Sequence, residues 1–148
     1  MIDRGLALNQ NLAVGWAYRG AISVYFGQHG AAIEQLTRSF RLNPLDPGSH
    51  WSEVHMAYAH LSEGRYDESL RWTSKALADR PDYAAAFCPA AIATALGRNI
   101  DQAGSFMLQM RRSYPEMRIS NLADYLVARR PEDMARMTEG LRLAGLPE

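Results

Sequence analysis

Three histidines and one glutamate lie in a short segment of the chain, at His50, Glu53, His55 and His60. Imidazole and carboxylate groups are common zinc ligands, so this segment is a candidate metal site. However, the histidines are five residues apart, and on a helix this spacing turns each one by about 140° from the last. Glu53 and His60 share a helix face but are separated by roughly 10 Å along the axis. The sequence therefore predicts no metal site.

Cys88 is the one cysteine and the other candidate for chemistry. A reactive thiol needs a nearby base or positive charge, and its neighbours Phe87 and Pro89 supply neither. We therefore predict a buried, inert thiol. The sequence also lacks a glycine-rich phosphate loop, a G-x-S-x-G motif and an H-E-x-x-H motif. These observations predict that the chain is not an enzyme and holds no cofactor.

Composition restricts the class of partner. The chain has 148 residues, enough for one domain with a substantial core, and its 16 basic and 16 acidic residues cancel. Without a net positive field, nucleic acid and anionic membranes are disfavoured as partners. No apolar run approaches the roughly 20 residues that span a bilayer. Because a lone cysteine needs no oxidising compartment, we expect a cytoplasmic protein, or a periplasmic one if its parent is membrane-anchored.

A repeat of about 34 residues organises the chain. Three alignable units cover residues 13–46, 50–82 and 83–116 of a single domain. Apolar residues follow helical spacing on both sides of a glycine-containing turn in each unit, which predicts a helical hairpin. Each unit also carries small residues midway along its helices, where two helices can pack closely. The turn glycines are Gly27, Gly64 and Gly97, the closing prolines are Pro44, Pro81 and Pro115, and the small residues are Gly20, Ala32, Ala57, Ser69, Ala90 and Ala103.

These units resemble the tetratricopeptide repeat, whose pattern reads W-x2-L-G-x2-Y, then A-x3-F, then P. Trp16 and Gly20 match it, whereas Arg19 and Ser23 depart from it and Pro89 lies inside an expected helix. The resemblance implies an all-α fold, a right-handed superhelix of antiparallel helix pairs. An ordinary helical bundle with coincidental spacing is the alternative.

A narrower resemblance rests on three segments, "LNQNLAVGWAYRG", "LNPLDP" and "RRPEDMARMTEGLRLAGLPE". They are similar to the C-terminal repeat region of bacterial signalling proteins, which follows adenylate/guanylate cyclase-like or winged-helix regulator domains. This resemblance implies a regulatory role by association.

Both ends differ from the repeats. Residues 1–12 look like the second helix of an earlier repeat, whose apolar face needs a neighbour. Either the chain is part of a longer protein or this end forms a homodimer, through Ile2, Leu6 and Leu8. Residues 117–148 are expected to form two capping helices. Ser120 would cap the first, through about Ala128, and Pro131 would open the second, which reaches Leu143.

The tetratricopeptide resemblance implies that the first helix of each unit lines a concave groove, where a protein or peptide partner binds. The expected lining is mainly apolar and aromatic, and it lacks the lysine, arginine and asparagine that hold a C-terminal carboxylate. The lining residues are Val14, Ala17, Ala21, Val24, Tyr25, Trp51, Val54, His55, Tyr58, Ala84, Phe87 and Ala91.

The sequence leaves two alternatives for what occupies this groove. It either receives a segment of a partner or is filled by the chain's own C-terminal helices or a second copy. The leading functional hypothesis is a non-catalytic scaffold or regulatory module. The alternative is a domain that senses a small molecule and reports to an attached cyclase or DNA-binding domain. A closed pocket around Trp51, Tyr58 and Phe87, rather than an open channel, would favour the alternative.

Overall fold

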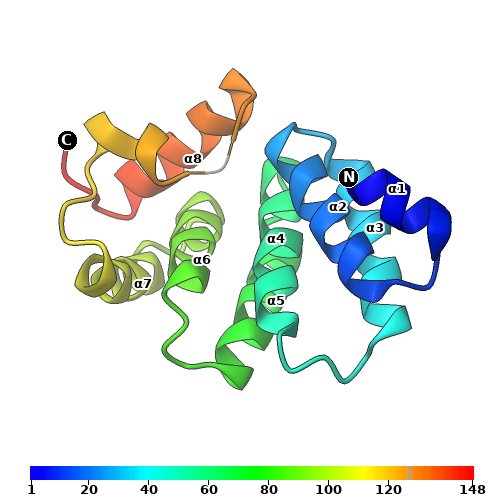
Figure 1. Ribbon diagram of the computed structural model, residues 1–148. Helices are drawn as coiled ribbons and strands as arrows, with labels where there is room; N and C mark the ends of the chain where they lie inside the picture. Colours follow the sequence, from blue (N-terminus) through cyan, green and yellow to red (C-terminus); the bar gives the residue numbers. More distant parts are fainter. Residues whose placement is uncertain (127) are drawn as a thin grey trace.

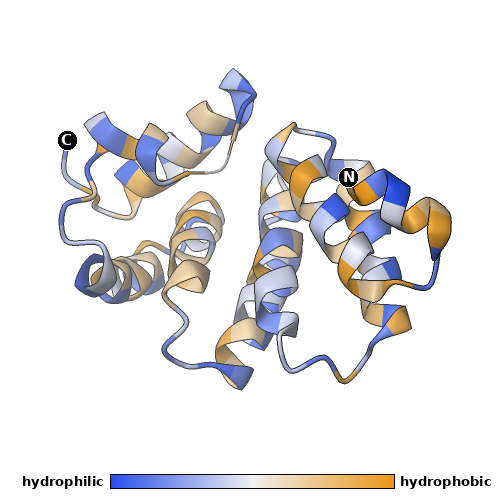
Figure 2. Cartoon of the chain, viewed as in Figure 1, coloured by the Kyte–Doolittle hydropathy of each residue, from blue (hydrophilic) through white to orange (hydrophobic). Residues whose placement is uncertain are grey.

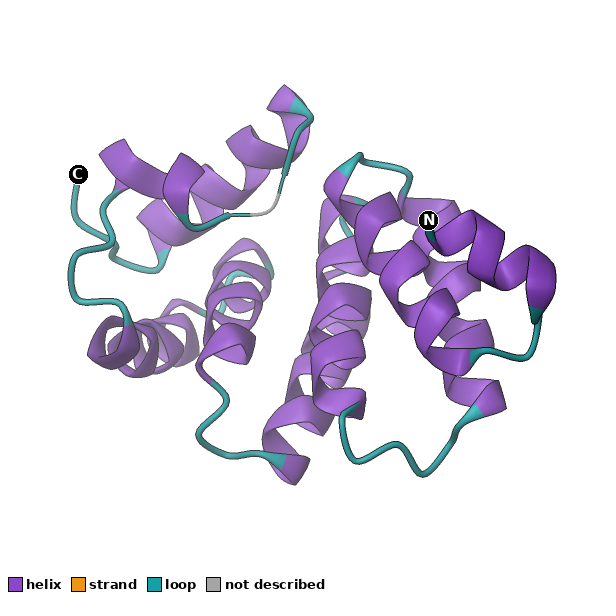
Figure 3. Cartoon of the chain, in the orientation of Figure 1, coloured by secondary structure: helices purple, strands orange, loops and turns teal. Residues whose placement is uncertain are grey.

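The computed structural model describes residues 1–126 and 128–148, and these residues form helices and connecting turns without a β-strand (Figures 1 and 3). This confirms the all-α prediction. The helices are α1 (Ile2–Leu8), α2 (Ala13–Tyr25), α3 (His29–Leu42), α4 (Ser49–Ser62), α5 (Tyr66–Asp79), α6 (Ala84–Leu96), α7 (Ile100–Ser113), the 3-10 helix η1 (Ile119–Asp124) and α8 (Pro131–Leu143).

Short turns join α2 to α3, α4 to α5 and α6 to α7, so each pair forms an antiparallel hairpin. Gly27 and Gly64 both have a φ of 75°, the left-handed conformation that glycine adopts without steric cost. In the third turn Arg98 takes this conformation instead, with a φ of 68°. Successive hairpins stack through α3 against α4 and α5 against α6, which confirms the predicted superhelix of antiparallel helix pairs.

Small residues bring the two helices of each hairpin close together. A Cβ atom added at Gly20 would lie 2.5 Å from the Leu36 Cγ atom, so α2 and α3 meet at a glycine. Ala57 and Ala90 occupy the equivalent places in α4 and α6 and are fully buried. The predicted role of these small residues is therefore confirmed.

Most of the hydrophobic core surrounds α6, which packs against α5, α7 and α8. Ile92 of α6, Met110 of α7 and Met137 and Leu141 of α8 are among its most buried side chains. Figure 2 shows that the other helices alternate apolar and hydrophilic positions along their length. In the described part of the chain, no helix is long and apolar enough to cross a membrane.

The first capping helix differs from its prediction. Residues 119–124 form a short 3-10 helix, and Ser120 does not cap an α-helix. Asn121 fixes this segment instead, because its side-chain oxygen accepts from the Arg118 amide at 2.7 Å and its amide group donates to the Glu116 carbonyl at 2.9 Å. Part of the predicted helix, Val127, lies outside the described residues. The second capping helix begins at Pro131 and reaches Leu143 as predicted.

Helix α8 packs along α6 (Figure 1), and side chains at its start and on its flank reach the first two hairpins. Arg130, just before α8, donates to the Gly27 carbonyl of the first hairpin, at 3.3 Å. Arg136 donates to the Tyr66 hydroxyl of the second at 3.1 Å. At the third hairpin α8 packs closely on α6 because Gly140 has no side chain to clash with Ile92. The C-terminal segment is therefore a brace that contacts every repeat.

Candidate binding site

A partly open pocket of about 180 Å³ lies on the concave side, between the first helices of the hairpins and the C-terminal segment. Five parts of the chain contribute to its wall: α2, α4, α6 with its N-terminal flank, the segment after α7, and the segment after η1. The lining residues are Val24, Trp51, Val54, His55, Tyr58, Tyr83, Ala85, Cys88, Tyr114, Met117, Tyr125 and Leu126.

Ring pairs hold most of the aromatic lining in place. The ring centroid of Trp51 lies 5.2 Å from that of Tyr18 and 4.2 Å from that of His55. Tyr114 and Tyr125 form an edge-to-face pair at 6.0 Å, so the segments after α7 and η1 meet at the pocket. Such aromatic pairs stabilise the folded state by about 0.5–1.5 kcal/mol beyond their buried area. The wall is therefore pre-formed.

No aspartate, glutamate, lysine or arginine is among the lining residues. Burial raises the pKa of the Cys88 thiol to about 11 and raises the pKa of the Tyr58 hydroxyl well above 10, so both are protonated at neutral pH. Burial also lowers the pKa of His55 below 6.5, while the hydrogen bond of its Nδ1 with the Trp51 carbonyl, at 2.8 Å, opposes this shift. The pocket is uncharged at pH 7, and its thiol is not a thiolate nucleophile.

Next to the pocket, α2 and the residue that follows it expose a line of large apolar side chains, which we name the α2 band: Val14, Tyr18, Ile22 and, directly after the helix, Phe26. These residues are four apart and therefore share one face of the helix. Between 46% and 55% of each residue is exposed to solvent. Since Tyr18 contacts Trp51, the band leads directly to the pocket wall.

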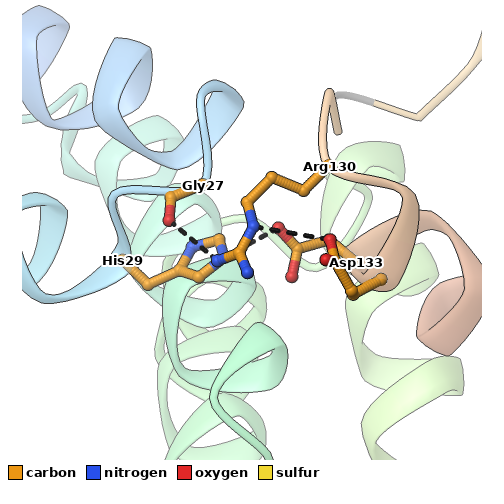
Figure 4. Close-up of polar contacts among 5 residues, drawn as sticks. Gly27, His29, Arg130 and Asp133 are labelled. Carbon is orange, nitrogen blue, oxygen red and sulfur yellow. Dashed lines mark hydrogen bonds and ion pairs between the residues drawn. The ribbon is translucent and has the colours of Figure 1, made fainter.

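Polar contacts join the α2–α3 turn to the start of α8 (Figure 4). His29 Nε2 lies 2.8 Å from Asp133 Oδ2, and both residues are buried. The Arg129 amide donates to the Tyr25 carbonyl at 3.1 Å, and its side chain donates to the Tyr25 hydroxyl at 2.6 Å. We name the contacts around His29, Asp133 and Arg129, with the Arg130–Gly27 hydrogen bond, the clasp.

The structure brings together only part of the predicted groove. Trp51, Val54, His55 and Tyr58 line the pocket with Val24. The others lie elsewhere: Val14 is in the α2 band, Ala21, Tyr25 and Ala84 are partly buried beside the pocket lining, Phe87 packs against the main core, and Ala17 and Ala91 are buried between helices.

Several lining residues were missed from the sequence: Tyr83, Ala85, Cys88, Tyr114, Met117, Tyr125 and Leu126. Tyr83 directly precedes α6, so the predicted first helices could have pointed to it. Nothing in the local pattern indicated that Met117, Tyr125 and Leu126 fold back over the groove. The chain's own segments after α7 and η1, rather than its C-terminal helices, cover part of the groove.

The N-terminal residues proposed for self-association are not equivalent. Leu6 is buried against α2, where its Cδ2 atom would lie 2.9 Å from a Cβ atom at Gly15. Ile2 is partly buried, and Leu8 is 83% exposed. The surface open to a second copy at this end is therefore centred on Leu8.

The histidine and glutamate segment has structural contacts instead of a shared site. Glu53 is fully buried in α4, and its Oε1 atom lies 3.1 Å from Lys75 Nζ of α5. His50 packs edge-on against Tyr83, with ring centroids 4.6 Å apart. Across residues 1–126 and 128–148, no three His, Cys, Asp or Glu side chains gather at a possible metal site.

No protein-family description and no curated protein matches the sequence. Among solved structures, the chain is similar to PilW, described as a widely conserved type IV pilus biogenesis factor. The two are 14% identical, with a TM-score of 0.48, over 97% of this chain and 78% of PilW. The fold is assigned from the packing of the helix pairs and not from this similarity.

Proposed function

We propose that this protein is a non-catalytic interaction module, a scaffold or regulatory part of a cytoplasmic bacterial signalling protein. Its α2 band would bind an apolar segment of a partner protein. The observation that carries this proposal is the band itself, four large apolar side chains in line on an exposed helix face. Contiguous exposed apolar surface of this kind is typical of interaction sites. Its four-residue spacing matches the contact face of an amphipathic partner helix.

The chemistry of the pocket supports a non-catalytic role. Its thiol is protonated, and no carboxylate lies in its wall to pair with His55 as an acid or to orient its ring. The His55 Nδ1 atom is already engaged with the Trp51 carbonyl of the same helix. The wall therefore lacks the second titratable group that an acid–base pair needs.

Co-purification from the source cells, compared across two variants, tests the proposal. Ile22→Glu places a charge in the middle of the α2 band, and Ser74→Glu places the same charge on an exposed part of α5. We expect Ile22→Glu to remove specific partners that Ser74→Glu retains, with both proteins equally stable. A partner set that Ile22→Glu leaves unchanged would contradict a role for the band.

A second candidate function is sensing of a small molecule in the pocket, with a report to an attached cyclase or DNA-binding domain. The observation that favours it is the enclosure of the pocket by the chain's own C-terminal segment, through Met117, Tyr125 and Leu126. A ligand there would contact the segment that leads into the clasp and α8. Occupancy could thereby change how firmly α8 braces the three hairpins.

A further inference from the structure

We propose that the pocket binds a small, uncharged aromatic molecule of one or two rings, such as an indole or a phenol. The proposal rests on the sensing function and specifies the class of ligand. Four features of the pocket carry it: the absence of charge, the paired aromatic rings, the uncharged polar groups in its wall, and the small, partly enclosed volume.

The lack of charged side chains in the wall disfavours ionised ligands. A carboxylate or phosphate that entered the pocket would lose its hydration, and no lysine or arginine lines the wall to replace it. The only ionisable nitrogen in the lining is that of His55, which burial keeps neutral at pH 7. An ammonium ion would likewise find no carboxylate among the lining residues.

An aromatic cage that binds a quaternary ammonium group is an alternative for these aromatic residues, and such a cage uses open ring faces. Here the rings of Trp51, Tyr83, Tyr114 and Tyr125 are each packed against another aromatic or imidazole ring. Less ring surface is therefore free to surround a cation. A neutral planar ring needs no set of encircling ring faces, because it packs edge-to-face or offset against single aromatic side chains.

Uncharged polar groups in the wall allow one or two hydrogen bonds to a ligand. Four tyrosine hydroxyls, the Trp51 indole N–H and the Cys88 thiol belong to lining residues, and Tyr58 and Cys88, which hydrogen-bond to each other, are both protonated at neutral pH. A phenolic hydroxyl both donates and accepts hydrogen bonds. A ligand with a single N–H or O–H group therefore matches this wall better than a pure hydrocarbon.

Size and enclosure favour a free molecule over a peptide. The volume of about 180 Å³ is below the roughly 300–1,000 Å³ typical of drug-sized ligand sites. The chain's own segments after α7 and η1 occupy part of the concave face along which a peptide would run, and the clasp joins the α2–α3 turn to α8. A peptide backbone would have to displace these segments, whereas a one-ring or two-ring molecule would not.

Isothermal titration calorimetry of the full chain with four probes tests this proposal: indole, benzoate, tetramethylammonium and N-acetyl-tryptophanamide. We expect indole to bind with a stoichiometry of one, at least about 10-fold more tightly than either ion, because both ions lose hydration without a counter-charge. Indole should also slow alkylation of Cys88, since the thiol lies in the wall. This second readout needs no variant.

Paired variants locate the binding site. Ala85→Trp fills the pocket, whereas Ala78→Trp adds the same side chain to the exposed face of α5. We expect the first to weaken indole binding at least about 10-fold and the second to leave it unchanged, because only Ala85 lines the cavity. Equal binding by both variants would overturn the proposal.

The possible outcomes distinguish a wrong ligand class from a wrong sensing function. Tighter binding of tetramethylammonium or benzoate than of indole would overturn the ligand class and leave sensing in place. No binding by any probe, with no protection of Cys88, would overturn the ligand class and remove the support for sensing. N-acetyl-tryptophanamide carries the peptide groups that flank a tryptophan side chain, so its tighter binding, weakened by Ile22→Glu, would overturn the proposal of a free ligand and make the pocket an anchor for a partner's side chain. In that case the interaction function would stand.

Discussion

Cys88 is a protonated thiol in the pocket wall, and its chemistry should report on the folded state. Only the thiolate reacts with alkylating reagents, and burial holds the pKa of this thiol at about 11. We expect iodoacetamide to modify the folded protein at least about 100-fold more slowly than the urea-unfolded chain at pH 7.5. Mass spectrometry over time measures both rates. Comparable rates would show that the thiol is not buried as described.

His55 makes stability depend on pH. Burial lowers the pKa of His55 in the folded protein. As the pH falls through about 6.5, His55 therefore becomes protonated in the unfolded chain while it is still mostly neutral in the folded protein. The free energy of unfolding should therefore fall as the pH drops below about 6.5, by at most about 1.4 kcal/mol per pH unit.

Urea unfolding at pH 7.5 and 5.5 measures this dependence, with His55→Phe as the test variant. This variant keeps a ring in the pocket wall and removes the titrating group, so we expect a smaller difference between the two pH values. Some dependence should remain, because burial also lowers the pKa of His60. An unchanged difference would contradict the role assigned to His55.

Individual residues were predicted unevenly. Burial of Cys88 followed from its uncharged neighbours, and the placement of Trp51, His55 and Tyr58 on one surface followed from the tetratricopeptide resemblance. The register on α2 was less accurate, because the exposed face runs through Tyr18 and Ile22 and not through Ala17 and Ala21. Hydrophobic spacing alone does not show which of two adjacent apolar faces the neighbouring helices cover.

At the scale of the elements, hairpin geometry depends on glycine where α2 meets α3. Gly20→Ala would place a Cβ atom 2.5 Å from Leu36 Cγ and 3.3 Å from the Leu36 backbone nitrogen. We expect a loss of about 1–3 kcal/mol in the free energy of unfolding, as in other overpacked cores. Gly104→Ala in α7 is the matched control, because nothing lies within 4 Å of its Cβ position. That change should stabilise by about 0.5–1 kcal/mol, and equal effects would contradict the described packing.

The clasp should hold α8 against the first hairpin. Asp133→Ala leaves the buried His29 without its hydrogen-bond partner, which is expected to cost about 1–3 kcal/mol. Amide hydrogen exchange should rise first in α8, since the clasp joins its start to the α2–α3 turn. Glu132→Ala is the control, because this neighbouring carboxylate is exposed and should contribute within about 0.5 kcal/mol.

A double variant measures the interaction between His29 and Asp133 apart from the contribution of each side chain alone. Replacing His29 and Asp133 together by leucine leaves no buried group without a partner, so it should be less destabilising than the sum of the single changes. Additive losses would show that the two side chains do not interact.

The hairpins were predictable because each depends on local signals: a turn glycine, small residues between helices and a closing proline. The clasp was not, since its partners are 104 residues apart and no local pattern links them. For the same reason, the course of residues 117–126 over the concave face was unexpected. The 3-10 helix also depends on the particular hydrogen bonds of Asn121.

For the whole molecule, one open question is self-association through the N-terminal helix. Since Leu6 is buried, Leu6→Glu would unfold this end as well as change its surface. Leu8→Glu alters only an exposed side chain. If this end is an interface, light scattering over a concentration series should show a dimer that Leu8→Glu converts to a monomer. A monomer for both proteins would contradict self-association.

We propose that a partner protein lies on the α2 band. Photo-cross-linking in the source cells tests this role, with p-benzoylphenylalanine placed at Ile22 and, as a control, at Ser74. We expect a discrete cross-linked protein from Ile22 that is absent from Ser74 and is lost when Tyr18→Glu is added to the band. The same products from both positions, or a product that persists with Tyr18→Glu, would contradict the claim.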